Sequence, residues 1–296
     1  GFFSLHAAAQ QVLTENEAVA KALANNKNIQ AASLQVKQQQ QLLKSAINLP
    51  NPDFFLESPT GKFYTGSITQ SFEFPTVYSN QYRLQKQQIG VAQKEKQLTE
   101  AELKYRVRIL YLEVQYADSL TKQLYVQDTL YEKIKLSAIR QFNAGQIDYL
   151  QQTFAETQYG EIHNQYQQSL TRAASLKAQL QWFTGVKDSI SLEPLTVSLS
   201  QTQFSFVPDS TALLSNPTIQ LLQQQENVAK QNIVLQKSKA LPGLAFGYFN
   251  QGERDTKWNN RFRFGITIPL WFGQYRGNIN AAETEQQVVE SKQQGL

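Results

Sequence analysis

The sequence predicts a mainly α-helical fold that adds a small membrane β-barrel contribution to long helical hairpins. Three observations support this fold class: helical stretches of unusual length, short strands with one apolar face, and an order of helix, strand, strand and helix that occurs twice. Long hairpins with water on several faces do not enclose a single core. They can instead line up as a ring of coiled coils when chains associate.

The longest predicted helix follows Pro75. Up to about Arg140 it contains no further proline and a single glycine, Gly90. A helix of this length would span roughly 95 Å at about 1.5 Å per residue. Gly145 can end it and Asp148 can cap a second helix, so residues 77–182 are predicted to form a helical hairpin.

The apolar residues of this hairpin form a narrow seam, with spacings of three and four. The seam consists of Val107, Leu110, Val114, Ala117 and Leu124, with Thr121 filling one position. This pattern is typical of coiled coils. The chain also contains 42 glutamines, most of them in the helical stretches. Glutamine forms helices well and is polar without charge, which favours helices that face water on more than one side.

The other helices are predicted at residues 15–48, at 217–239 and from 275 to 296. Thr14 and Glu17 fit a capping box at the start of the first helix, and Asn25-Asn26 indicates a short break in it. Residues 184–215 are rich in serine and threonine and contain Pro194 and Pro208, so they are predicted to be an irregular linker.

Strands are predicted at residues 53–58, 63–74, 243–250 and 261–271. The second and fourth alternate between apolar and polar residues, as a strand with two different faces does. One face carries Tyr64, Ile68, Phe72, Phe74, Phe262, Phe264, Ile266 and Ile268. The opposite face carries Thr65, Ser67, Thr69, Arg261 and Arg263.

The same order of elements occurs twice. Ile29-Gln30 and Leu49-Pro50 correspond to Ile219-Gln220 and Leu241-Pro242. Pro75 follows Pro50 by 25 positions, and Pro269 follows Pro242 by 27. The sequence therefore predicts a first repeat over residues 1–183, the linker over 184–215 and a second repeat over 216–296.

Two-faced strands of this length suit a membrane barrel, with lipid outside and water inside. The apolar set above is then lipid-facing and the polar set lumen-facing. Four strands are too few to enclose a channel, and an open sheet edge in lipid would leave backbone groups unsatisfied, so several chains must share the barrel. A soluble antiparallel sheet that packs on one face shows the same alternation. In this sequence the strands are joined to two sets of long hydrophilic helices, and this combination favours the barrel.

The composition excludes several other classes of function. There is no cysteine, and the two histidines, His6 and His163, are far apart, so no metal site, thiol chemistry or cofactor is predicted. The net charge is only +4 with mixed signs, which argues against nucleic-acid binding. Asp53 and Glu57 share a strand face, but no catalytic arrangement accompanies them, so we expect no enzyme activity.

Several stretches resemble the TolC family of trimeric outer-membrane efflux channels. The stretches are Ala22–Asn26 with Ile29–Ala32, the Leu-Pro pair before each first strand, residues 140–148 (RQFNAGQID) and residues 268–273 (IPLWFG). Their order and duplication make the resemblance specific over nearly the whole chain. Residues 247–251 (GYFNQ), followed by the strand end at 268–272, are most similar to the heavy-metal (cation) efflux branch.

The resemblance implies a homotrimer with a trimeric α-barrel in the periplasm and a shared 12-stranded β-barrel in the outer membrane of a Gram-negative bacterium. It also implies two partners: a periplasmic adaptor protein and an inner-membrane pump of the resistance–nodulation–division class. The hairpin turn is the docking end in the family, a role that falls here on Arg140, Gly145 and Asp148. The duct would export metal ions or small toxic compounds.

Two alternatives remain open from the sequence: a periplasmic adaptor, which also uses long helical hairpins, and a coiled-coil scaffold without a transport role. An adaptor would have soluble β domains and extract without detergent, whereas a channel needs detergent. The first copy continues for 105 positions from Pro75 to Leu180, while the second ends 27 positions after Pro269. We therefore expect the sequence to be part of a longer protein, with a fuller second hairpin.

Overall fold

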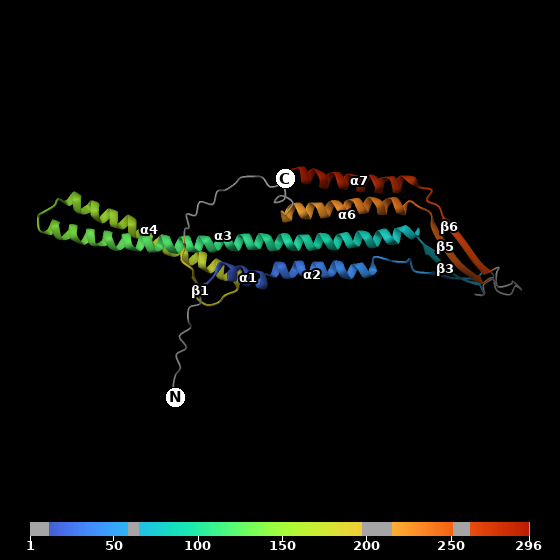
Figure 1. Cartoon of the computed structure of the whole chain (residues 1–296), viewed down its shortest axis with the longest axis horizontal. Helices are drawn as coiled ribbons and strands as arrows, with labels where there is room; N and C mark the ends of the chain where they lie inside the picture. The colour runs from blue at the N-terminus through green and yellow to red at the C-terminus, as the bar shows by residue number, and fades with distance from the viewer. Residues whose placement is uncertain (1–11, 59–64, 197–214, 251–260, 296) are drawn as a thin grey trace, which may run out of the picture. The chain divides into compact units, whose positions relative to one another are not determined.

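The computed structural model describes residues 12–58, 65–196, 215–250 and 261–295 (Figure 1). The chain forms two compact units. The first consists of residues 1–29 and 100–206, and the second of residues 30–99 and 207–296. One helix of 69 residues, α3 (Pro75–Asn143), contributes to both.

The first unit is a helical hairpin with a small apolar core at its base. It contains β1 (Val12–Leu13), α1 (Glu15–Asn25), the later part of α3, α4 (Tyr149–Thr184) and β4 (Ser191–Leu192). β1 and β4 pair in parallel. The predicted seam of α3 is confirmed, because all five of its apolar members are buried. Three of them, Val107, Leu110 and Val114, pack with Leu13, Ala18, Val19, Ala22, Leu180 and Ile190.

Local hydrogen bonds fix α1 against this core. The predicted capping box is confirmed, since Thr14 Oγ1 accepts from the Glu17 amide and the Thr14 amide donates to the Glu17 carboxylate. The Tyr111 hydroxyl donates to the Leu13 carbonyl over 2.8 Å. Burial is the main reason that the pKa of Tyr111 is raised. The side-chain amide of Asn25 donates to the Thr184 carbonyl and so joins α1 to the end of α4.

The second unit joins a four-stranded sheet to helices. Its strands are β2 (Asp53–Glu57), β3 (Thr65–Phe72), β5 (Gly243–Asn250) and β6 (Phe262–Thr267). They pair antiparallel in the order β2-β3-β5-β6, so the two hairpins meet at β3 and β5. The helices are α2 (Lys27–Leu42), the short 3-10 helix η1 (Leu43–Ser45), the first part of α3, α6 (Pro217–Lys239) and α7 (Phe272–Gln294). α6 and α7 lie side by side (Figure 1).

Uncharged amide side chains link the helices of the second unit. Gln85 Nε2 donates to the Gln39 side-chain oxygen over 2.8 Å and also to the Gln39 carbonyl. Gln224 Nε2 makes the same pair of contacts with Gln87. The buried Asn80 donates to Ser238 Oγ over 2.6 Å. These contacts give part of the glutamine enrichment a structural role, because polar groups between helices need partners when water is excluded.

The same contacts explain the glycine within α3. A Cβ at Gly90 would lie 2.6 Å from Gln224 Nε2 and 2.8 Å from its Cδ, which is closer than real Cβ contacts come. Gln224 crosses α3 at this point to reach Gln87. Glycine at position 90 therefore leaves room for the amide contact between α6 and α3, although glycine is unfavourable inside a helix.

Three predicted elements differ from the structure. In the stretch predicted to be helical over 15–48, the predicted break is confirmed at Asn26, whose side chain caps the amides of Asn28 and Ile29, but helical structure ends at Ser45. The strand expected over 261–271 ends at Thr267, because Pro269 has no amide hydrogen to donate, and α7 already begins at Phe272. The linker expected over 184–215 contains β4, and its residues 197–214 lie outside the described chain.

The remaining predicted elements lie close to their expected positions. β2 ends at Glu57, one residue before the predicted end, and β3 covers 65–72 of the predicted 63–74, of which 63 and 64 lie outside the described residues. The two compact units do not coincide with the two predicted repeats, because α3 runs through both units. The division into repeats describes a sequence duplication and stays a prediction.

Substituting Gly90 tests the amide contact. In the wild type, Gly90→Ala displaces the Gln224 amide, so the loss of its hydrogen bonds offsets the gain of about 1 kcal/mol in helix propensity. In a Gln224→Ala background the same substitution should raise the free energy of unfolding of the protein by about 1 kcal/mol. The thermal unfolding midpoint of the four proteins of this cycle measures the coupling. An equal effect of Gly90→Ala in both backgrounds would contradict this explanation.

Candidate functional site

The pairing register shows how the side chains of the four strands align across the sheet. Residues directly opposite each other on neighbouring antiparallel strands project from the same face. One row across all four strands is Phe54, Ile68, Tyr248 and Phe262. The next rows on this face are Gln70 with Phe246 and Phe264, and Phe72 with Leu244 and Ile266. The sheet therefore has one mainly apolar face, on which Gln70 and, at the end of β5, Asn250 are the polar residues of the paired strands.

The residues that the structure describes leave this apolar face uncovered. The exposed fractions are 82% for Phe264, 67% for Ile266 and 68% for Phe54. Aromatic rings contact each other along the face, with Phe246 and Phe264 centroids 5.1 Å apart. A water-soluble chain would normally bury such a surface, because contiguous exposed apolar patches mark contact with another protein or with lipid.

The opposite face carries mainly small and polar side chains, together with the aromatic Phe55 and Phe249. Its central row is Asp53, Thr69, Gly247 and Arg263. Neighbouring rows are Phe55 with Ser67 and Phe249, and Ser71 with Ala245 and Gly265. The Arg263 guanidinium lies 5.2 Å from the Phe249 ring centroid. Small side chains on one face suit a sheet that curves toward that face, since a barrel leaves less room for side chains on its concave side.

The sites predicted from the alternation fall on the sheet as follows. Ile68, Phe72, Phe262, Phe264 and Ile266 lie on the apolar face, and Ser67, Thr69 and Arg263 on the polar face, each fixed by the register. Thr65 begins β3 opposite Glu57. Tyr64 lies outside the described residues, and Phe74 and Ile268 lie just beyond the ends of β3 and β6.

Arg261 differs from the prediction. It was expected beside Arg263 on the polar face, but it precedes β6 and its Nη1 donates to the Tyr248 hydroxyl over 3.3 Å. Tyr248 belongs to the apolar face. Because Arg261 is outside the paired strand, the alternation does not hold its side chain on the polar face, and its long side chain turns to the tyrosine hydroxyl instead.

The turn of the α3–α4 hairpin is a Schellman motif. The Gln146 amide donates to the Gln141 carbonyl and the Gly145 amide to the Phe142 carbonyl, each over 2.9 Å. Gly145 has φ +71°, a conformation that other residues adopt only with strain. Asp148 then caps α4, since its Oδ1 accepts from the Gln151 amide over 2.8 Å. The structure thus gives Gly145 and Asp148 the stop and start roles that the sequence predicts for them.

Sequence reasoning missed an apolar surface at this hairpin tip. Tyr149, Leu150 and Phe154 are exposed by 69%, 75% and 65%, and Phe142 contacts the Tyr149 ring edge-on with centroids 6.1 Å apart. Arg140 is exposed beside them on the last turn of α3. The sequence does contain a signal for this surface, because apolar residues directly follow the cap of α4, where a helix start exposed to water would carry polar residues.

The described residues contain neither a cluster of metal-ligating side chains nor a helix that could span a membrane. No group of three or more His, Cys, Asp or Glu side chains there is arranged to hold a metal ion. Among the helices of the described segments, none is both long enough and apolar enough to span a membrane.

Comparison with solved structures finds outer-membrane channels. A crystal structure of CusC, from work on its transmembrane channel formation, aligns with 94% of this chain and 71% of its own, at a TM-score of 0.75 and 17% identity. The CmeC outer membrane channel of Campylobacter jejuni aligns with 100% of this chain and 72% of its own, at a TM-score of 0.73 and 16% identity. The outer membrane protein VceC of Vibrio cholerae aligns with 95% of this chain and 74% of its own, at a TM-score of 0.71 and 13% identity.

The chain has the fold of an outer-membrane channel protomer. This confirms the predicted fold class, in which long helices are combined with a few strands. No protein-family model and no curated protein matches the sequence. With identities this low, the fold is recognisable through the arrangement of helices and strands.

Gly145 and Gly160 form a matched pair for testing the turn. A Cβ at either position would meet no atom within 4 Å, but only Gly145 has positive φ. Gly145→Ala should destabilise the hairpin by about 1–2 kcal/mol through backbone strain. Gly160→Ala, inside α4, should stabilise by up to about 1 kcal/mol. Amide exchange of residues 139–155 measures the first effect, and unchanged exchange there would show that the turn tolerates alanine.

Proposed function

We propose that this chain is the protomer of an outer-membrane channel that serves a tripartite efflux system as a passive export duct, without catalytic activity. The observation that carries the proposal is the uncovered apolar face across all four strands. The channel fold of the matching structures supports it.

Lipid is the environment that suits this sheet. Exposed side chains such as Phe264 and Ile266 would be unfavourable in water at about 25 cal/mol per Å² of apolar surface, and favourable in hydrocarbon. β2 and β6 are the edge strands, and their free backbone groups would each cost several kcal/mol in lipid. Neighbouring chains can satisfy both edges, so three copies with four strands each would close a 12-stranded barrel around the polar face.

The helices support the same oligomer. Besides the buried seam, α3 carries a second apolar seam that is exposed in the single chain, formed by Tyr105, Ile109, Leu112 and Tyr116. Its spacing of four, three and four residues is that of a coiled-coil seam. Helices of neighbouring copies would cover it in a homotrimer, with the α-barrel extending into the periplasm and the sheet in the outer membrane of a Gram-negative bacterium.

Partner docking is proposed at the hairpin tip. Arg140, Gly145 and Asp148 carry this role in the family that the chain resembles, and the exposed Tyr149 and Leu150 add apolar surface beside them. The partners proposed are a periplasmic adaptor protein and, through it, an inner-membrane pump of the resistance–nodulation–division class. In this arrangement the pump supplies the energy and the chain supplies the path.

The class of exported compound is the most specific part of the proposed function. Of the residues that resemble the heavy-metal branch, 247–250 lie in β5 and 268–272 follow β6, and the polar face with Thr69 and Arg263 would line a water-filled lumen. We therefore propose metal ions or small toxic compounds as substrates, with selection made by the pump. Growth of a deletion strain on a panel of metals and drugs, with and without the intact gene, separates these two classes.

This proposal is favoured over an adaptor and over a scaffold. The compact β domains of an adaptor would bury one sheet face in a soluble core, whereas Phe54 and Phe264 at opposite edges of this sheet are both largely exposed. A coiled-coil scaffold has no use for an apolar sheet face. Extraction that requires detergent distinguishes the channel from both alternatives.

Two adjacent residues of β6 test the channel. Phe264→Arg puts a charge on the lipid-facing side, which costs about 2–4 kcal/mol near the bilayer centre, so membrane insertion and conductance in planar bilayers should fall strongly. Arg263→Glu, on the polar face, should insert normally and shift the reversal potential toward cation selectivity. Normal conductance by the Phe264→Arg variant would contradict a lipid-facing role for this face.

A charge reversal tests docking at the tip. Arg140→Glu should lower drug or metal tolerance in a complemented deletion strain while leaving bilayer conductance unchanged, because only partner contact is lost. Lys133→Glu makes the same charge change on an exposed residue of α3, two turns before the tip, and should complement normally. Equal growth of the two variants would remove Arg140 from the docking surface.

A further inference from the structure

The apolar face of the sheet carries a charged group at the end that lies away from the helices. Arg261 directly precedes β6, and its Nη1 donates to the Tyr248 hydroxyl over 3.3 Å. Tyr248 pairs with Phe262 in a row of the apolar face, so this contact holds the guanidinium on that face. The helices α3, α6 and α7 join the opposite end of the sheet, where β3 and β6 end and β5 begins.

This guanidinium has no anionic partner within the residues that the structure describes. No carboxylate among them forms an ion pair with Arg261, and its Nε is buried there without a hydrogen-bond partner. Glu57, at the same end of the sheet, pairs with Thr65 and lies on the polar face. A charge that is partly removed from water is costly unless an opposite charge and hydrogen bonds accompany it. An anion that complements Arg261 therefore has to come from outside the described residues.

Aromatic rings continue from the guanidinium along the apolar face. The Tyr248 and Phe262 rings meet edge-on with centroids 6.0 Å apart. Phe246 stacks on Phe262 at 5.8 Å and contacts Phe264 at 5.1 Å. All three phenylalanines keep exposed surface. A ligand that matches this column of rings has an acyl chain that lies along them and an anionic group that reaches the guanidinium.

We propose that Arg261, Tyr248 and this column of rings bind a lipid of the outer leaflet whose headgroup carries a phosphate. The inference rests on the proposed function, which puts the helices in the periplasm and thus Arg261 at the outer surface of the membrane. A guanidinium suits phosphate because its planar set of N–H donors forms charge-assisted hydrogen bonds, and the Tyr248 hydroxyl fixes one of these donors in place. Long basic side chains near the ends of membrane-spanning segments reach the headgroup layer in this way.

Arg263 is the matched control for Arg261. It lies two positions further along, in the central row of the polar face, where its guanidinium is 5.2 Å from the Phe249 ring centroid. The two arginines thus have the same charge and nearly the same position in the chain, but they belong to opposite faces of the sheet. Only the one on the apolar face should contribute to lipid binding.

The test is lipid binding by the full chain in detergent, measured by native mass spectrometry with diphosphoryl lipid A as the probe. Arg261→Gln should bind this lipid about tenfold more weakly than the wild type, because charge-assisted hydrogen bonds are lost. Arg261→Lys should recover part of the affinity, since lysine keeps the charge without the planar set of donors. Arg263→Gln should bind the lipid as the wild type does.

Two further probes separate the lipid phosphate from other ligands. Lipid A from which both phosphates have been removed should bind the wild type and Arg261→Gln equally, because the rings alone hold it. A large excess of inorganic phosphate should leave diphosphoryl lipid A bound to the wild type. Its displacement by inorganic phosphate would assign Arg261 to a free anion and overturn the lipid site.

The lipid site is also refuted if Arg261→Gln binds diphosphoryl lipid A as tightly as the wild type, or if Arg261→Gln and Arg263→Gln weaken binding alike. Binding in detergent requires no conductance, so the two proposals can fail separately. A conducting channel with either of these results would keep the proposed function and lose the lipid site. Selective loss of lipid by Arg261→Gln in a chain that does not conduct would refute the channel and leave the lipid site.

Discussion

The structure depends on an apolar sheet face that the described part of the chain leaves uncovered. In most soluble domains the helices that accompany a sheet cover its apolar face, but here α6 and α7 continue away from the strand ends and pack on each other (Figure 1). Phe54, Phe264 and Ile266 stay exposed as a result. The surroundings must therefore provide the hydrophobic contact, and on the proposed function the strands of neighbouring chains would provide hydrogen bonds for the two sheet edges.

The helices must likewise be joined although several of their faces are exposed to water, and uncharged amide side chains join them. Helices that stand in water on several sides have narrow seams, and Gln39, Gln85, Gln87 and Gln224 fill the gaps between them with amide contacts. Such contacts are not screened by salt as exposed ion pairs are. They also tie the helices to one register, because each donor meets a particular acceptor. Gly90 is part of this arrangement, since it leaves room for the Gln224 amide to cross α3.

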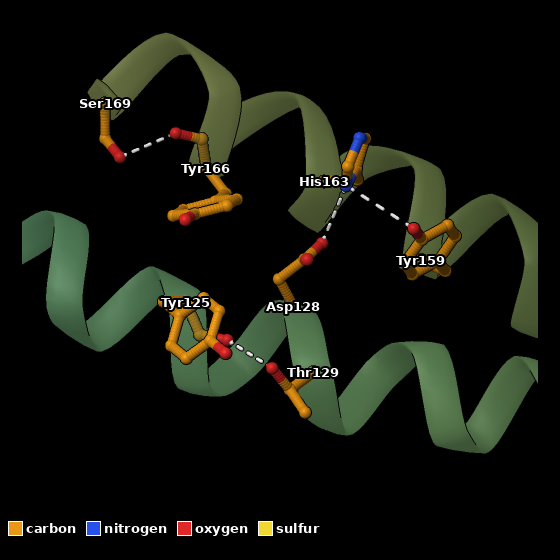
Figure 2. A network of polar contacts seen from close by, with 7 residues as sticks. All are labelled: Tyr125, Asp128, Thr129, Tyr159, His163, Tyr166 and Ser169. Carbon is orange, nitrogen blue, oxygen red and sulfur yellow. Dashed lines mark hydrogen bonds and ion pairs between the residues drawn. The ribbon is translucent and has the colours of Figure 1, made fainter. Parts of the chain in front are cut away.

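The hairpin is held together differently along its length. Its base has a true apolar core, whereas its distal half relies on Asp128, His163 and the tilted ring pair of Tyr125 and Tyr166, which contribute less burial and more directionality (Figure 2). Regions with few buried apolar contacts open more easily than the rest of a fold.

The sequence by itself determined the helical hairpin, its glycine stop and aspartate cap, and the apolar seam of α3, because these follow from spacing and local backbone chemistry. It also separated the two strand faces, since alternation is local. Only the tertiary structure decided that both hairpins present the same face, because strand register depends on pairing between distant residues. It likewise placed Arg261 beside Tyr248, put Gln224 across Gly90, brought Asp128 to His163 and left Leu150 exposed, all contacts that depend on how elements pack and that no local pattern encodes.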